Sequence, residues 1–120
     1  MRDHDTYATR RLMEVSEGGT AVGITSVIYQ EVLQGAASPA KFGYIADHLG
    51  SQTFYSPLHT KTSYKEAARM YFACRRQGIT IRSSIDCLIA RVAIEHDLLL
   101  LHDDRDFEAL AGIIPELALA

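Results

Sequence analysis

The chain has 120 residues, of which 48% are hydrophobic. That length and composition suit one compact domain with a real core, and they exclude a chain that is disordered throughout. The formal net charge of -3 argues against a wide basic nucleic-acid surface, although a local basic strip is compatible with it.

The cysteines and the hydropathy pattern indicate the compartment. Cys74 and Cys87 fall inside predicted helices and form no CxxC pair. This favours a reduced, cytoplasmic protein in which both are small apolar packing residues. No stretch is long enough to cross a membrane, and residues 1–20 are too polar for a signal peptide, so we expect no membrane partner.

The first half of the chain predicts short elements that end at glycine or proline. Ser and Thr precede the apolar-periodic segments as N-caps, and glycine follows them. In chain order we expect a helix over residues 6–17, a strand over residues 21–24, a helix from a cap at Thr25 or Ser26 to Gln34, a helix over residues 39–49 and a strand over residues 53–55.

The second half predicts longer helices around a run of four leucines. In chain order we expect a helix from Thr60 or Ser63 to Gln77, a helix from a cap at Ser83 or Ser84 to about His96, a strand over residues 98–101 that helices cover on both faces, a helix over residues 106–111 and an edge strand over residues 117–119. The alternation predicts an α/β fold with a mostly parallel sheet flanked by helices. Sites in such folds form beyond the carboxyl ends of the strands.

Two acids are placed unusually on the predicted helices. Glu31 follows Val27 by four residues and Ile28 by three, which puts its charge beside the apolar face, where burial is costly unless the charge is paired or binds a metal. The alternative is a boundary residue whose carboxylate reaches water. Asp86 lies in the first turn of its helix, where the dipole alone favours an acid.

Three more acids follow the leucine run. We expect Asp104 to face the edge of the sheet, Asp106 to support the ligating residues or to cap a helix, and Asp103 to face solvent. His102 is interpreted as a structural, hydrogen-bonding residue. We interpret the arginines of this half as ordinary surface residues: Arg75, Arg76, Arg82, Arg91 and Arg105.

Carboxylates that converge without a compensating Lys or Arg call for a divalent cation. The histidines show neither HxxxH nor HxH spacing, which argues against zinc. Ligation by oxygen alone favours Mg²⁺ or Mn²⁺.

Three segments together resemble the PIN-domain family. Residues 25–35 (TSVIYQEVLQG) resemble its E-L-x-x-G helix, and residues 84–90 (SIDCLIA) its D-x-x-I-A helix. Residues 100–107 (LLHDDRDF) resemble its T-x-D-x-D-F segment, with His102 in place of the usual Thr or Ser. Each motif is weak alone, but their order and spacing agree over nearly the whole chain, and the VapC-type toxins of toxin–antitoxin pairs resemble it most.

The resemblance implies a PIN-like three-layer domain and a Mg²⁺-dependent endoribonuclease. Carried over by motif, the catalytic and metal-binding acids are Glu31, Asp86 and Asp104, and the auxiliary residues are Asp106 and Ser84. It further implies an RNA substrate, a cognate antitoxin and a homodimer.

The N-terminus departs from the family pattern. PIN domains begin with an apolar strand that ends in an acid, but residues 1–7 contain no such strand, and Asp5 is too close to Glu31. We therefore expect a single PIN-like domain over residues 1–120 that is N-terminally incomplete. Three explanations are open: a late start or truncated chain, a strand from another chain, or a degenerate family member.

Two other functions stay open at this point. One is a catalytically incomplete PIN-like module that binds an antitoxin or RNA without cleavage. The other is a different α/β phosphotransfer domain, such as a receiver. A receiver needs an acidic pair after its first strand and a Lys near its last, and the sequence has neither.

Overall fold

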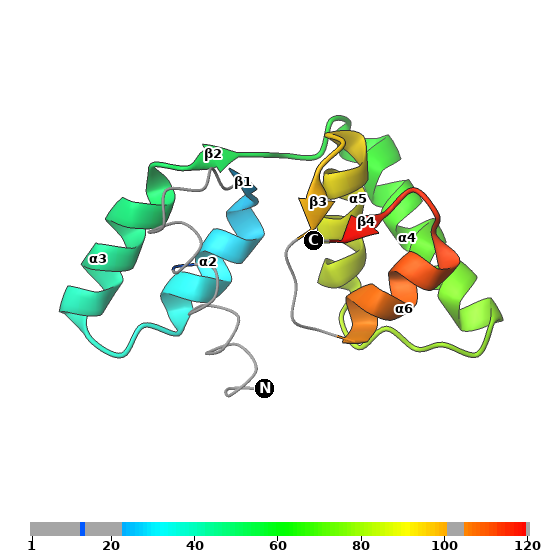
Figure 1. Cartoon of the computed structure of the whole chain (residues 1–120), viewed down its shortest axis with the longest axis horizontal. Helices are drawn as coiled ribbons and strands as arrows, with labels where there is room; N and C mark the ends of the chain where they lie inside the picture. Colours follow the sequence, from blue (N-terminus) through cyan, green and yellow to red (C-terminus); the bar gives the residue numbers. More distant parts are fainter. Residues whose placement is uncertain (1–12, 14–22, 101–104, 120) are drawn as a thin grey trace. The chain divides into compact units, whose positions relative to one another are not determined.

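The computed structural model describes Met13, residues 23–100 and residues 105–119 (Figure 1). The chain divides into two compact units, Met1–Ser56 and Pro57–Ala120. Each unit has its own helices, its own pair of strands and its own buried side chains.

The first unit contains a pair of parallel strands. β1 (Gly23–Ile24) lies beside β2 (Thr53–Phe54), with Ile24 opposite Phe54. The Tyr55 N–H donates to the Ile24 carbonyl at 2.8 Å, which extends the pairing by one hydrogen bond. The structure thus confirms the strand at residues 53–55 and the described part of the strand that precedes the first cap.

Side-chain caps fix where the two helices of this unit begin. α2 (Ser26–Gln34) starts after Thr25, whose hydroxyl accepts from a backbone N–H three residues later at 3.2 Å. α3 (Pro39–Gly50) starts after Ser38, whose hydroxyl accepts in the same way at 3.1 Å. A hydroxyl acceptor satisfies an N–H that has no partner inside the helix. Gly35 follows α2, as its sequence predicts.

The core of the first unit gathers between α2, α3 and β1. Its buried members are Met13, Ile24, Ile45 and Leu49, and its partly buried members are Ile28, Tyr29, Val32, Leu33 and Ala36. Tyr29 connects the helices, because its hydroxyl donates to the Ala46 carbonyl at 3.0 Å. Its ring also meets the edge of Phe54 with centroids 5.1 Å apart. Met13 is the described residue of the helix predicted over residues 6–17, and it is helical and buried.

The second unit begins with a pair of long helices. Its elements are α4 (Thr60–Arg76), α5 (Ser84–Glu95), β3 (Leu99–Leu100), α6 (Arg105–Ile113) and β4 (Ala118–Leu119). β3 and β4 pair in parallel, and α6 connects them. α4 packs along α5, and α6 contacts both (Figure 1). These elements match the helices and the edge strand expected from the sequence.

Small and medium apolar side chains fill the space between these helices. Those with less than a tenth of their surface exposed are Ala67, Met70, Cys74, Ile81, Cys87, Ile89, Ala90, Val92, Ala93, Phe107, Leu110 and Leu117. The two cysteines are 0% and 1% exposed, so their interpretation as apolar packing residues is confirmed.

The leucine run differs from its prediction. Leu99 is 68% exposed, so the expectation that helices cover this strand on both faces is wrong for the described residues. Among the described strands, β3 pairs with β4 alone, which leaves the run in a two-stranded ribbon. A continuous apolar run therefore predicted the strand correctly but not its burial.

The architecture is α/β, with helices between strands that pair in parallel. The longest described helix, α4, has 17 residues and is rich in charge. Within the ranges given above, no helix combines the length and the apolar character needed to cross a bilayer.

Candidate functional site

Glu31 lies on α2 in the first unit. Ile28 and Val32 of the same helix pack against the core, whereas Glu31 is exposed. The Glu31 side chain is therefore not buried against the apolar face, and its role as a metal ligand stays a prediction. The case for Glu31 as a metal ligand rests on its place in the sequence motif.

Asp86 lies in the first turn of α5 and is half-buried. The Ser83 hydroxyl accepts from the Ile85 N–H at 3.2 Å, and this cap sets the residue at which α5 begins. The Asp86 N–H donates to the Ser83 carbonyl at 3.1 Å. Ser84, predicted as an auxiliary residue, is exposed at the first position of the helix.

Asp106 lies in the first turn of α6 and has a strong partner. Its Oδ2 accepts from the Arg82 backbone N–H at 3.0 Å and from the Arg82 Nε at 3.1 Å. The Asp106 side chain is 13% exposed and the Arg82 side chain 67%. The two bonds hold the segment before α5 against the start of α6.

Arg82 is the residue that the sequence interpretation missed. It was expected to be an ordinary surface cation, and the acids were expected to have no compensating Lys or Arg. The second expectation is wrong for the Arg82–Asp106 pair, whereas Arg82 lies at the surface as expected. The partners lie 24 residues apart, so no helical or strand period connects them. The available signal was the position of Arg82 directly before the Ser83 cap.

The buried thiol of Cys87 lies within the electrostatic reach of Asp86 and Asp106. Burial raises the pKa of Cys87 to about 12, and the negative charges of Cys74, Asp86 and Asp106 act in the same direction. Both acids are bonded to neighbouring residues of one segment, because Asp106 accepts from the Arg82 N–H and the Asp86 N–H donates to the Ser83 carbonyl. Figure 1 shows the starts of α5 and α6 side by side at one end of the second unit.

The structure therefore brings Asp86, Asp106 and Arg82 together. Glu31 belongs to the first unit, and Asp104, like Asp103 and His102, lies outside the described residues. Within the described ranges, no three His, Cys, Asp or Glu side chains are grouped so as to hold a metal ion. The site formed by Glu31, Asp86 and Asp104 stays a prediction.

The chemistry of these candidate donors fits a hard divalent cation. Glu31 and Asp86 offer carboxylate oxygens, which Mg²⁺ and Mn²⁺ prefer over nitrogen or sulfur ligands. The two thiols are buried in the helix packing. Asp106 already accepts from Arg82, which suits it to a positioning role.

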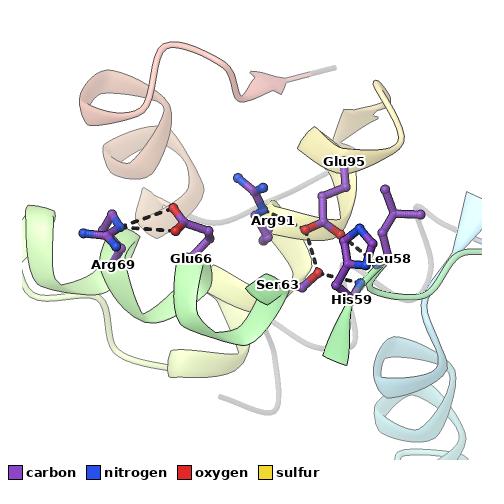
Figure 2. Close-up of polar contacts among 7 residues, drawn as sticks. All are labelled: Leu58, His59, Ser63, Glu66, Arg69, Arg91 and Glu95. Carbon is purple, nitrogen blue, oxygen red and sulfur yellow. Dashed lines mark hydrogen bonds and ion pairs between the residues drawn. The ribbon is translucent and has the colours of Figure 1, made fainter. Parts of the chain in front are cut away.

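A second polar cluster lies at the other end of α5 (Figure 2). The Glu95 carboxylate accepts from the Leu58 N–H at 2.9 Å, from the Ser63 hydroxyl at 2.7 Å and from the Arg91 Nε at 2.8 Å. The Ser63 hydroxyl accepts in turn from the His59 N–H at 3.1 Å. Burial alone would raise the pKa of Glu95, but the hydrogen bonds and the Arg91 charge outweigh it and lower the pKa. The cluster fastens the start of α4 to the end of α5.

A comparison with known protein families shows which family the chain belongs to. The PIN domain model matches residues 1–113. The chain therefore belongs to the PIN domain family, which confirms the resemblance and the α/β fold expected from the three motifs.

The similar proteins are of the VapC type. The chain is 34% identical over 104 residues to VapC ribonuclease Mb1587 of Mycobacterium bovis, a match that covers 87% of this chain and 75% of that protein. The same identity and coverage hold for Ribonuclease VapC11 of Mycobacterium tuberculosis strains CDC 1551 and H37Rv.

Proposed function

We propose that this chain is an endoribonuclease that hydrolyses RNA phosphodiester bonds with the help of Mg²⁺ or Mn²⁺. The observation that carries the proposal is the 34% identity, over most of the chain, to proteins named as ribonucleases. The acids at the motif positions support it, because Glu31, Asp86 and Asp104 supply the oxygen ligands that these cations prefer.

In this proposal the three acids have one task, which is to hold the cation. Glu31 contributes from α2, Asp86 from the first turn of α5, and Asp104 from the segment before α6. When bound, the cation lowers the pKa of a water molecule and offsets negative charge on the phosphate.

The neighbouring residues position these acids. Asp106 holds the Arg82 backbone and side chain, and this keeps the start of α6 close to the cap of α5, where Asp86 lies. Ser84 is exposed two residues before Asp86 and supplies a hydroxyl to a ligand or to the substrate. The Ser83 cap fixes the first turn of α5 and therefore the backbone position of Asp86.

The biological role proposed here is that of the toxin of a toxin–antitoxin pair. The support for it is the VapC type of the similar proteins. A cognate antitoxin that silences the nuclease and a homodimeric assembly belong to the same proposal.

The test is cleavage of structured RNA by the purified chain with Mg²⁺, with EDTA, and after single substitution of each acid. Glu31→Gln, Asp86→Asn and Asp104→Asn should each lower the cleavage rate at least about a hundredfold, since even residues that only orient metal ligands contribute ten- to hundredfold. Asp47→Asn is the matched control, because Asp47 is an exposed acid on α3 outside the motifs.

Cleavage that persists in EDTA, or in all three substituted proteins, would contradict hydrolysis by these acids. A folded chain that binds RNA and leaves it intact with Mg²⁺ and with Mn²⁺ would favour the PIN-like binding module. Circular dichroism of each variant separates loss of activity from loss of folding.

A further inference from the structure

One face of α4 is turned away from the core of the second unit. The buried residues of α4 are Ser63, Ala67, Met70 and Cys74. Residues 61, 65, 68 and 72 lie two positions before them, which is about half a turn around a helix with 3.6 residues per turn. All four of these residues are exposed.

This exposed face is basic in a chain that is acidic overall. α4 carries five of the chain's twelve Lys and Arg residues but only one of its fifteen acids, Glu66. Glu66 pairs with Arg69, with Glu66 Oε1 3.3 Å from the arginine Nε. Among the residues that the structure describes, Lys61, Lys65 and Arg75 form no ion pair.

Two aromatic rings lie among these cations. Tyr64 is 52% exposed and Phe72 is 59% exposed, although rings of this size are usually buried in packing. The Arg76 guanidinium lies over the Phe72 ring, 5.9 Å from its centroid. An exposed ring next to a guanidinium provides a flat surface on which a base can stack.

We propose that this face of α4, formed by Lys61, Tyr64, Lys65, Phe72, Arg75 and Arg76, binds single-stranded RNA. The cations contact the phosphates, and the two rings stack on bases. The choice of RNA rests on charge complementarity together with the interleaved aromatics, since phosphates recruit cations and unstacked bases recruit rings. A solvated helix surface accounts for the charges, but it does not account for two exposed rings in the same row.

This inference rests on the proposed function, because RNA is the substrate named there. It adds which surface of the protein binds the single-stranded RNA. The face is formed by residues outside the three motifs, so binding and cleavage are separable by substitution.

The experiment measures binding of a fluorescein-labelled RNA to the full chain in EDTA, where metal-dependent cleavage does not occur. The probe is a mixed-sequence single strand of about 20 nucleotides, longer than the usual site of one single-strand-binding fold. Fluorescence anisotropy gives the Kd at several salt concentrations for the wild type, for the double variant Lys65→Gln/Arg75→Gln and for Phe72→Ala.

The double variant should raise the Kd about tenfold or more, and it should reduce the slope of log K against log salt by about 1.4, because each phosphate contact to a single strand contributes about 0.7. Phe72→Ala should raise the Kd about fivefold or more through lost stacking, with the salt slope unchanged. The matched controls are Lys41→Gln and Phe42→Ala, an exposed cation and an exposed ring on α3, and they should leave the Kd unchanged.

Equal Kd values for the wild type and the α4 variants would overturn the inference, as would equal effects of the α3 controls. Thermal unfolding of each variant excludes a loss of structure as the cause. Metal-dependent cleavage with unchanged binding would leave the proposed function standing and remove the inference. RNA binding that depends on the α4 face, without any cleavage, would support this inference and contradict the proposed nuclease function.

Discussion

Glu95 shows how one carboxylate can join segments that the sequence separates. It accepts hydrogen bonds from Leu58, Ser63 and Arg91, and its side chain is only 6% exposed. The His59 cap of α4 makes no side-chain hydrogen bond. Instead, the Ser63 hydroxyl and the Glu95 carboxylate accept from the N–H groups of His59 and Leu58, which fixes the segment that enters the helix. A carboxylate with several hydrogen bonds in a largely buried place stabilises the fold only while it is ionised.

Glu95→Gln should therefore lower the free energy of unfolding by about 2 kcal/mol near neutral pH, as expected for hydrogen bonds to a charged group. The folded pKa lies below the ordinary value of 4.5. The contribution is complete above the unfolded pKa and is lost as the pH falls through the folded pKa. Urea titrations from pH 7 to pH 3 should show the gap between wild type and variant closing below about pH 4.5.

Glu116→Gln is the control for this titration, because Glu116 is an exposed acid of the same unit. A gap between wild type and Glu95→Gln that stays constant over the whole pH range would show that the charge of Glu95 contributes nothing to stability.

The two thiols should be inert in the folded protein. With the pKa of Cys87 at about 12, only about one thiol in ten thousand is ionised at pH 8, and thiolate is the reactive form. Burial raises the pKa of Cys74 as well. Ellman's reagent should label both cysteines within seconds in guanidinium chloride and neither on that timescale in buffer. Rapid labelling of the native chain would refute the burial of these side chains.

At the scale of single elements, the end of α4 requires a backbone conformation that favours glycine. Gly78 follows the helix with φ +80, a conformation that side chains rarely adopt, and the N–H groups of Gln77 and Gly78 close the last turn. Gly112 lies inside α6, where no atom within 4 Å blocks a Cβ. The same substitution should therefore have opposite effects at the two positions.

Gly78→Ala should destabilise the protein by about 1 kcal/mol, because the left-handed conformation is strained for alanine. Gly112→Ala should stabilise it by roughly 0.5–1 kcal/mol, because alanine has the higher helix propensity. Chemical denaturation measures both. Changes of the same sign at the two positions would contradict this account of the α4 terminus.

The sequence predicted the helices better than the surroundings of the strands. Helix boundaries are set by local signals, and the caps at Thr25, Ser38 and Ser83 are observed within a residue of the expected starts. Strand burial depends on what covers the strand from elsewhere in the chain. For this reason the leucine run was recognised as a strand, whereas the exposure of Leu99 was not foreseen.

The sequence predicted which types of residue form the candidate site, but it predicted only some of the contacts between them. The motif spacing identified Asp86, and the structure adds that Asp106 bonds Arg82, which directly precedes the cap of the same helix. The sequence could not predict that Arg82 pairs with Asp106, because tertiary packing brings these two distant residues together. It also overestimated the burial of Glu31, because proximity to an apolar face on a helix does not decide which way a long side chain extends.

At the scale of the whole molecule, the central prediction is that the three motif acids Glu31, Asp86 and Asp104 bind one cation. A ligand that binds only the folded chain stabilises it by about 2.7 kcal/mol at a concentration one hundred times its Kd. Mg²⁺ should therefore raise the melting temperature of the wild type. The increase should vanish in Glu31→Gln, from the first unit, and in Asp86→Asn, from the second.

Differential scanning fluorimetry with and without Mg²⁺ makes this measurement without any RNA. Asp47→Asn serves again as the control and should keep the full increase. If Glu31→Gln keeps the increase while Asp86→Asn loses it, Glu31 is not a ligand of the cation, and the three-acid site is refuted.

The charge of α4 has a consequence for how the molecule meets a polyanion in solution. With five basic residues and one acid on this helix, the remainder of the chain holds seven basic and fourteen acidic residues. The field of a nucleic acid should therefore attract α4 and repel the net negative charge of the remaining residues before the two molecules touch. Encounters should therefore be fastest in dilute buffer and slow markedly once added ions shorten the reach of that field.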